Sequence, residues 1–358
     1  MVGLYIHIPF CLSKCKYCDF VSYTDKSDSM ADYIDAVIDE AKRYQGEEAN
    51  TVFIGGGTPA ALPVGEMTRL ISGVSKYIKI LKDAEFTVEV NPNSITRKKA
   101  EEYSSLGVNR ISIGLQTTKA ELLKRIGRTH SAEDFYAAVE TVLKAKIHNI
   151  NVDMMYSLPG QKIEDVVETA RVITSLPIGH VSAYALKLEE GTPLYNEHPQ
   201  LPDEDMDREM FYAIRDILKE KNIIRYEISN FAKRGLECKH NLKYWLVKDY
   251  IGLGVSAHSC YKGIRYYNAR SIDEYILNNE NVGGELQDLT KERIMLKLRL
   301  SSGIPLEQMP KGKNIQALMQ RYVDLGAAKI FEGRLILTDR GMDVQNYIVS
   351  DIFAAMEK

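Results

Sequence analysis

The stretch HIPFCLSKCKYCDF, residues 7–20, places Cys11, Cys15 and Cys18 within eight residues of one another. It follows the apolar, β-branched run Leu4–Ile8, which predicts a strand. Three thiols are one too many for a disulfide and one fewer than the four ligands of a closed structural zinc site. We therefore expect a metal site on this loop that keeps one coordination position open.

The spacing of these cysteines, C-x3-C-x2-C, favours an iron–sulfur cluster over zinc. Three thiolates on one turn suit three irons of a [4Fe–4S] cluster, whose fourth iron then lacks a protein ligand. Zinc stays an alternative, because His7, Cys238 or Cys260 could supply a fourth ligand. In the cytosol thiols stay reduced, so clustered cysteines indicate metal binding or catalysis more than crosslinking.

The composition is that of a globular protein with a large core. Of the 358 residues, 45% are hydrophobic and 27% charged, with a formal net charge of −3. These values exclude a disordered or collagen-like chain and give no sign of nucleic-acid binding. The N-terminus lacks a signal-peptide pattern, and no run of about 18 apolar residues occurs. We expect a cytoplasmic protein.

Short apolar runs alternate with segments of helical period, which indicates an α/β protein. The six runs cover residues 4–8, 51–56, 86–90, 110–115, 150–156 and 180–186. Strands buried on both faces form a parallel sheet, and six strands are fewer than the eight of a closed barrel. We therefore predict a partial (β/α)6 TIM-type barrel whose functional face lies at the carboxyl ends of its strands. Ser131 and Asp134 predict a capping box at one helix start.

The chain divides into three predicted segments. Residues 1–200 form the barrel, and residues 201–287 extend it. Within the second segment, the Gly-, Tyr-, His- and Asn-rich stretch from Tyr226 to Tyr267 predicts an irregular functional loop. Residues 288–358 predict a winged-helix-like domain with a hairpin turn at Glu332-Gly333. Its basic residues are balanced by acidic ones, so we do not expect DNA binding.

The cysteine loop after a first strand resembles that of the radical S-adenosylmethionine (SAM) enzymes. In that superfamily the amino and carboxylate groups of SAM chelate the open iron, and an electron from the cluster cleaves SAM to a radical. Further motifs are similar to those of the oxygen-independent coproporphyrinogen oxidase group, which includes the HemW heme chaperones. They are GGGTP (55–59), EVNP (89–92), GLQ (114–116), VDMMYSLPGQ (152–161) and HNLKYW (240–245). The resemblance covers nearly the whole chain.

The resemblance implies which residues bind SAM, with one or two SAM molecules left open. The implied positions are Tyr5, Tyr17, Gly56, Gly57, Thr58, Glu89, Gln116, Arg128 and Asp153. The residues themselves allow this assignment without requiring it. Glu89 and Asp153 lie inside apolar strands, where an unpaired carboxylate is costly, so each needs a partner. That partner could equally be another residue of this chain. The glycines could likewise serve only a tight turn.

Two features separate the chaperone from the oxidase within this group. The oxidase has another cysteine two residues beyond the third, where this chain has Phe20, and an extension before its first strand, which here starts at Leu4. The resemblance therefore favours a heme chaperone that delivers heme to heme-requiring proteins, membrane-associated respiratory proteins among them. It also suggests a homodimer. The alternative is an oxidase that makes protoporphyrinogen IX from coproporphyrinogen III by two radical decarboxylations.

The motif HNLKYW contains the chain's only tryptophan and carries the prediction of heme binding. A neutral imidazole is a competent ligand of heme iron, and flanking aromatic rings can cover a porphyrin face. His240 is therefore the predicted ligand, and His258 is a second candidate. The alternative is a packed loop in which His240 forms local hydrogen bonds. A zinc-stabilised binding module is the third class of function considered.

Overall fold

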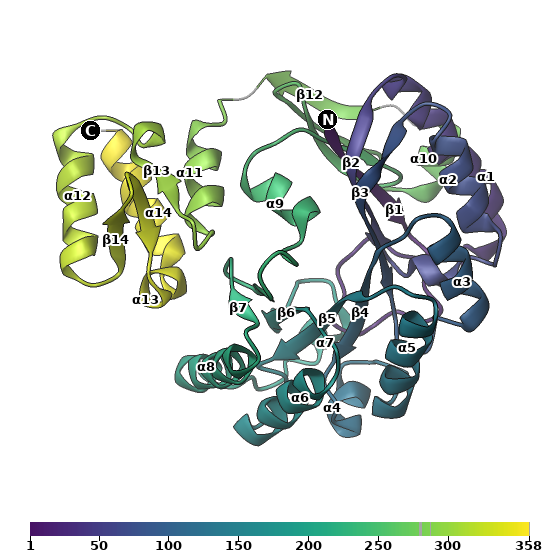
Figure 1. Cartoon of the computed structure of the whole chain (residues 1–358), viewed down its shortest axis with the longest axis horizontal. Helices are drawn as coiled ribbons and strands as arrows, with labels where there is room; N and C mark the ends of the chain where they lie inside the picture. The colour runs from purple at the N-terminus through teal and green to yellow at the C-terminus, as the bar shows by residue number, and fades with distance from the viewer. Residues whose placement is uncertain (279–280, 287, 358) are drawn as a thin grey trace.

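The centre of the molecule is the predicted open barrel, seen in a computed structural model that describes residues 1–278, 281–286 and 288–357 (Figure 1). All six predicted strands are parallel and neighbour one another in sequence order. They are β1 (Val2–Ile8), β2 (Glu48–Gly56), β3 (Lys79–Val90), β4 (Arg110–Gln116), β5 (Asn149–Tyr156) and β6 (His180–Ala185). The prediction of a partial (β/α)6 barrel is confirmed.

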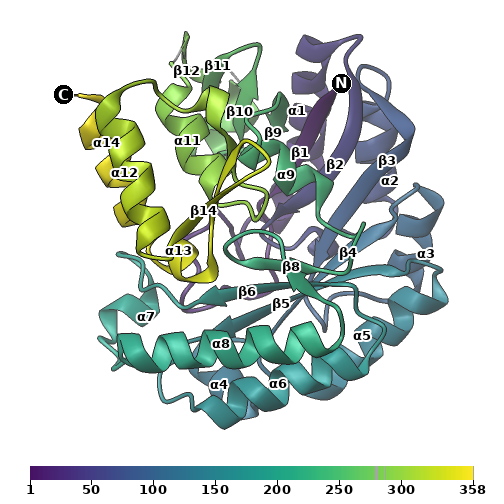
Figure 2. The same ribbon diagram turned by 60° about the vertical axis from the view of Figure 1, so that its left-hand side comes forward.

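Amphipathic helices cover the outer face of this sheet (Figures 1 and 2). They are α1 (Met30–Ala41), α2 (Glu66–Val74), α3 (Arg97–Ser105), α4 (Ala120–Arg125), α5 (Ala132–Lys144), α6 (Ile163–Ser175) and α8 (Glu204–Glu220). Shorter helices are α7 (Pro193–Asn196), α10 (Ile272–Leu277) and the 3-10 turns Ser27–Ser29, Lys42–Tyr44, Pro59–Ala61 and Leu306–Gln308. The predicted capping box is present, because the backbone N–H of Ser131 and Asp134 each donate to the other residue's side chain. None of the described helices has the length and hydrophobicity needed to cross a bilayer.

The interpretation of Tyr226–Tyr267 as an irregular loop is wrong. This segment contains β8 (Asn230–Ala232), α9 (Lys239–Trp245), β9 (Tyr250–Leu253), β10 (His258–Tyr261) and β11 (Ile264–Asn268). The strand β9 pairs parallel to β1, and β10, β11 and β12 (Asn281–Leu286) continue that edge antiparallel. At the other edge β8 pairs with β6 and with β7 (Ile224–Arg225). Strands of two to five residues are too short to display the alternation from which strands are predicted.

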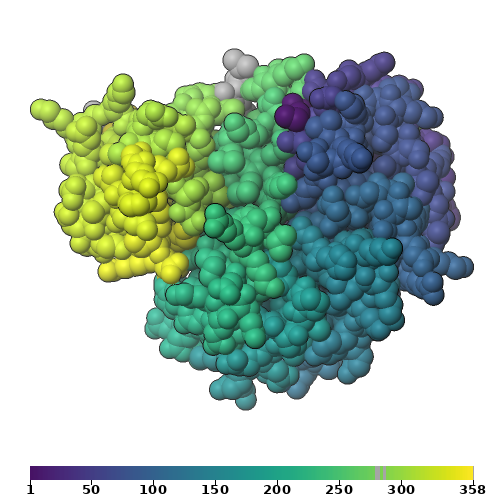
Figure 3. Space-filling model, viewed as in Figure 1, coloured from purple at the N-terminus to yellow at the C-terminus, as the bar shows by residue number. Residues whose placement is uncertain are grey.

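The C-terminal region builds its own hydrophobic core and forms a lobe beside the barrel (Figure 3). It consists of α11 (Thr290–Leu298), β13 (Ile304–Pro305), α12 (Lys313–Asp324), β14 (Ala328–Phe331), β15 (Arg334–Leu337), α13 (Asp339–Asp343) and α14 (Gln345–Met356). The predicted hairpin turn is present, with Glu332 and Gly333 at φ 48° and 70°. The predicted segment boundary at residue 287 lies outside the described residues.

Several contacts among the described residues attach this lobe to the barrel. Arg299, just after α11, pairs with the buried carboxylate of Glu227 at 2.7 Å and lies 4.2 Å from the ring centre of Trp245 in α9. Asp343 in α13 accepts a hydrogen bond from Arg208 of α8 at 2.9 Å. The first helix of the lobe is therefore joined to the segment that carries the HNLKYW motif.

Candidate functional site

The cysteine loop lies where the sequence analysis expects it, at the carboxyl ends of β1 and β2. The backbone N–H of Gly57 donates to Ile8 at 2.9 Å, and that of Thr58 donates to Phe10 at 2.8 Å. Lys16, in the middle of the loop, donates its N–H to Ile126 at the end of α4. Backbone hydrogen bonds to two other segments thus fix the loop before any ligand is considered.

The three loop thiols are free, partly buried and close enough to influence one another. The pKa of Cys18 is raised to about 11, mainly by burial and to a smaller extent by the neighbouring thiols Cys15 and Cys11. Burial also raises the pKa of Cys11. Among the described residues, no three His, Cys, Asp or Glu side chains converge as ligands of one metal ion. This arrangement suits thiolates that each bind a different iron.

The candidates for a fourth zinc ligand are engaged elsewhere. The Nε2–H of His7 donates to the carbonyl of Val21 at 2.8 Å, which leaves Nδ1 to accept from the hydroxyl of Tyr5 at 2.9 Å. Cys238 is fully buried beside Glu85, 3.6 Å from its carboxylate, and Cys260 is buried in β10. The zinc alternative therefore lacks its fourth ligand in the part of the chain that the structure describes.

Arg128 places a positive charge and a spare donor beside the loop. It donates to Cys15 Sγ at 3.4 Å, to Asn91 Oδ1 at 2.8 Å and to the carbonyl of Gly114. Its Nε is buried with no hydrogen-bond partner in the described part of the chain. A guanidinium at this position leaves one donor for an acidic ligand group.

Asn91 and Thr58 connect this arginine to the first cysteine. Asn91 Nδ2 donates to Thr58 Oγ1 at 2.9 Å, and that oxygen lies 3.6 Å from Cys11 Sγ. Thr58 is nearly fully buried. Its side chain therefore contacts the cysteine loop, and its contact with SAM stays a prediction.

The packing of the protein itself requires glycine at positions 56 and 57. Gly56 has φ +110°, and a Cβ there would lie 2.5 Å from the ring of His7. A Cβ on Gly57 would lie 2.8 Å from the carbonyl oxygen of Phe10. Both glycines thus allow the cysteine loop to dock on β2. Whether they also contact SAM stays a prediction.

Beside the cysteine loop, inside the barrel, lies a cavity of about 560 Å³ that we call the inner chamber. Seven of the predicted site residues line it: Tyr5, Tyr17, Cys18, Glu89, Gln116, Asp153 and His240. Gln116 ends β4 with φ 68°, a left-handed conformation that non-glycine residues rarely adopt. Such strained residues occur preferentially at functional sites.

The two carboxyl groups of the inner chamber differ in their partners. Asp153 accepts from Asn151 Nδ2 at 2.7 Å and from Ser112 Oγ at 3.2 Å, so its partners are other residues of this chain. Glu89 accepts only the N–H of Gly56, at 3.1 Å, among the described residues. Burial and the nearby Asp153 raise the pKa of Glu89 to about 8. Glu89 therefore has unused capacity for a cationic or hydroxyl group of a ligand.

His240 lies in α9 with no exposed surface, and both of its ring nitrogens have partners. Nδ1 hydrogen-bonds with Thr51 Oγ1 at 2.9 Å, and Nε2 with the hydroxyl of Tyr244 at 2.7 Å. Burial and the nearby Lys243 lower its pKa to about 3. Iron binding at Nε2 would require Tyr244 to leave, so this geometry matches the packed alternative. Heme ligation by His240 stays a prediction.

Sequence reasoning missed a set of polar side chains on β4, β5 and β6. Residues that line the inner chamber and were not predicted include Arg110, Ser112, Asn151, Ser182 and Tyr184. A signal was present, because polar residues occupy every second position of otherwise apolar strands, as in R-I-S (110–112), N-I-N-V-D (149–153) and H-V-S (180–182). Alternation of this kind places polar groups on one face of the sheet.

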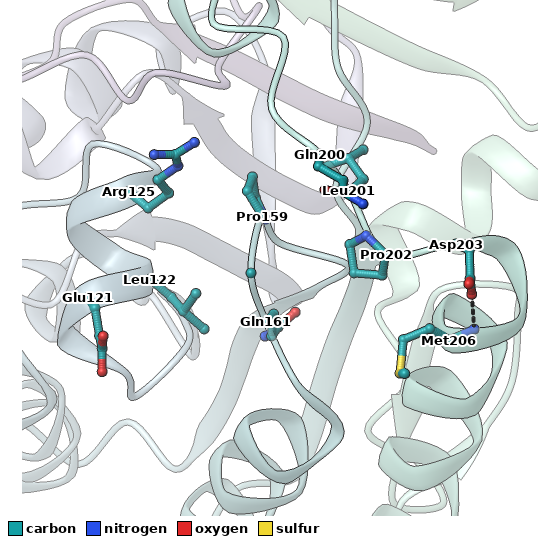
Figure 4. A pocket seen from close by; sticks show the side chains of 11 residues that line it. Glu121, Leu122, Arg125, Pro159, Gln161, Gln200, Leu201, Pro202, Asp203 and Met206 are labelled. Carbon is teal, nitrogen blue, oxygen red and sulfur yellow. Dashed lines mark hydrogen bonds between the residues drawn. The ribbon is translucent and has the colours of Figure 1, made fainter.

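Volume alone does not identify the site. A cavity of about 760 Å³ lies between α4, the turn at Pro159–Gln161 and the segment 200–206 (Figure 4). Figure 4 shows Arg125 and Leu122 of α4 on one side and Met206, whose N–H donates to Asp203, on the other. None of the predicted site residues lines this cavity.

Comparison with known proteins shows one superfamily and several relatives that share a name. The model of the radical SAM superfamily matches residues 5–173. A protein of Lactococcus lactis named heme chaperone HemW is 33% identical, over 96% of this chain and 95% of its own length. A protein of the same name from Bacillus subtilis is 32% identical, over 97% of this chain and 98% of its own length. The one from Escherichia coli is 38% identical, over 72% of this chain and 69% of its own length.

A solved structure confirms the fold. The coproporphyrinogen III oxidase HemN of Escherichia coli, described as a radical SAM enzyme, superposes with a TM-score of 0.85. The match covers 98% of this chain and 89% of HemN, at 19% sequence identity. At that identity the likeness concerns the fold and leaves the activity open.

Proposed function

Because the chain belongs to the HemW family within the radical SAM superfamily, we propose that it binds heme and delivers it to heme-requiring proteins. One observation carries this proposal: the similarity to a protein named heme chaperone HemW extends over 96% of the chain, at 33% identity. The recipients that we propose include membrane-associated respiratory proteins, and we propose a cytoplasmic location and a homodimer.

The cofactors of this proposal are a [4Fe–4S] cluster and SAM. Cys11, Cys15 and Cys18 would bind three irons, and the bound cluster supplies a fourth iron with a free coordination position. Glu89, with one protein partner, and Arg128, with a spare Nε donor, would bind the charged groups of SAM. The tyrosines, Gln116 and Asp153 would surround the rest of the ligand in the inner chamber.

The second candidate function is oxidative decarboxylation of coproporphyrinogen III, as the name of HemN, which shares this fold, suggests. Phe20 argues against it, because this residue stands where the resemblance gives the oxidase another cysteine. Its side chain is 62% exposed and lines the inner chamber, so it can contact an apolar ligand but cannot bind metal.

A transfer assay separates the two functions. Anaerobic reconstitution should give a brown protein with about four irons per chain. Loaded with ferric heme and mixed with a heme-free b-type cytochrome, it should transfer the heme, as the cytochrome absorption spectrum reports. Incubation with coproporphyrinogen III, SAM and a reductant should release no carbon dioxide. Failure of the protein to bind heme would refute the chaperone proposal, and release of carbon dioxide would establish the oxidase.

A further inference from the structure

A second chamber lies on the other side of two tyrosines that line the inner one. This outer chamber has a volume of about 510 Å³, within the usual range for small-molecule sites. Tyr5 and Tyr244 line both chambers, as does Phe20 of the cysteine loop. The outer walls come from α9, β9, β10, β11 and the first helix of the C-terminal lobe, through Glu292.

We propose that the outer chamber is the heme site and that His258, rather than His240, is the protein ligand of the heme iron. The proposal rests on the proposed function and adds to it the place where the cargo is held. It separates cargo from cofactors, because SAM and the cluster occupy the inner chamber and the cysteine loop.

His258 has the properties that an iron ligand requires and that His240 lacks. Its side chain is exposed, and neither ring nitrogen hydrogen-bonds to another described residue. The ring stacks on Tyr267, with centroids 5.3 Å apart, which fixes its orientation. Burial, then the charges of Arg270 and Arg265, lower its pKa, so the imidazole is neutral at pH 7. A neutral imidazole is the form that binds iron.

Aromatic side chains suited to a porphyrin plane line the same chamber. The ring of Tyr250 packs edge-on against Tyr244, 4.5 Å between centroids. Phe20, 62% exposed, lies at the boundary of the two chambers. Trp245 also lines the chamber, and its indole N–H is buried without a hydrogen-bond partner among the described residues. An unpaired buried donor is costly, and a heme propionate would satisfy it.

A positive charge that could pair with the second heme propionate lies near His258, the proposed ligand of the heme iron. Arg270 lies over the ring of Tyr267, 5.7 Å from its centroid, and no carboxylate of the described residues pairs with it. Arg265 already has protein partners, because it donates a hydrogen bond to Tyr250 at 2.6 Å and forms an ion pair with Glu292. Arg270 is therefore the guanidinium that can pair with a carboxylate of the cargo.

The HNLKYW motif then has a positioning role. His240 hydrogen-bonds with the hydroxyl of Tyr244 at 2.7 Å, and Tyr244 lines both chambers. Trp245, the last residue of the motif, contributes to the outer wall. His240 acts on the cargo through Tyr244, without touching the iron.

The test is a ferric heme titration followed by absorption and electron paramagnetic resonance. His258→Ala should weaken heme binding at least about tenfold, since even outer-sphere changes at metal sites cost that much. His258→Cys should restore binding with a thiolate spectrum. His240→Ala should keep the wild-type imidazole spectrum, and the exposed His148→Ala is the matched control. Arg270→Glu should weaken binding of heme and of metal-free protoporphyrin IX alike, whereas His258→Ala should spare the latter.

Two results would overturn the proposal. One is a wild-type spectrum and affinity in His258→Ala, and the other is loss of the imidazole spectrum in His240→Ala while that variant still binds heme. Both leave the chaperone function standing, because heme is still bound. Absence of heme binding in the unaltered protein would instead refute the proposed function itself. Circular dichroism of each variant verifies that it is folded.

Discussion

The inner and outer chambers share Tyr5 and Tyr244 as walls but differ in their chemistry. The inner chamber presents carboxyl groups, among them Glu89 with a single protein partner, next to three thiols. The outer chamber presents aromatic rings and an imidazole without a hydrogen-bond partner among the described residues. The first suits a small charged molecule held against a metal cluster, and the second suits a flat apolar ligand with acidic edges. On our proposal, the protein therefore holds cofactor and cargo in separate chambers.

The largest effect that tests this difference is loss of the cluster. Cys15→Ser should abolish the iron–sulfur absorption and, with it, tight SAM binding, because a hydroxyl is a poor ligand for iron in such clusters. Heme binding in the outer chamber should be unchanged. Iron analysis and heme titration measure the two effects, with the buried Cys260→Ser as control. If heme binding is lost together with the cluster, the chambers are not independent.

The next largest effect concerns the inner carboxylate. Glu89→Gln should weaken SAM binding of the reconstituted protein about tenfold or more, because a hydrogen bond to a charged group contributes about 1.5–3 kcal/mol. Heme affinity should not change. Equilibrium dialysis with labelled SAM measures the effect, and Glu209→Gln on the exposed surface is the control. Unaltered SAM affinity would remove Glu89 from the SAM site.

A smaller effect, on protein stability, should follow from a change at the start of α9, the helix whose Tyr244 lines both chambers. The buried carboxylate of Glu85 accepts the backbone N–H of Lys239 at 3.0 Å and of His240 at 2.9 Å, at the start of α9. Glu85→Gln should lower the free energy of unfolding by about 1–2 kcal/mol, as loss of a helix cap does. Denaturant titration measures it. Unchanged stability would mean that α9 is held mainly by its side-chain packing.

The last effect is a pH dependence of the ligand-free protein. The folded-state pKa of Glu89 is raised from 4.5 to about 8, so between these values the folded state binds more protons than the unfolded chain. Stability therefore falls as pH rises through this window. The stability of Glu89→Gln relative to the unaltered protein should increase from pH 5 to pH 8, as thermal unfolding measures. A constant difference would show that Glu89 is not desolvated.

The barrel could be predicted because its strands are long and its helices amphipathic. The segments 48–56 and 149–156, for example, form strands of nine and eight residues that include β-branched side chains. The segment after residue 226 could not be predicted, because β8, β9 and β10 each have three or four residues. In addition, β8 pairs with β6 and β9 pairs with β1, which are distant in sequence. In this segment the fold depends on close approach of backbone to backbone. A Cβ at Gly252, for example, would lie 2.3 Å from the carbonyl oxygen of His258.

The candidate site, like the fold, could be predicted in part from the sequence. Motifs located the cysteine loop and seven residues of the inner chamber. They could not reveal that the ring of His240 is held by Thr51 and Tyr244, because this depends on how α9 packs against β2. They also gave no indication that His258 faces a chamber which α11 of the C-terminal lobe helps to close.

The most direct measurement is a titration of ferric heme into the cluster-loaded protein with and without saturating SAM. Separate chambers predict that both ligands bind together and that SAM leaves the heme dissociation constant nearly unchanged, while His258→Ala raises it in both conditions. If SAM displaces heme competitively, cofactor and cargo share one site and the central claim is wrong.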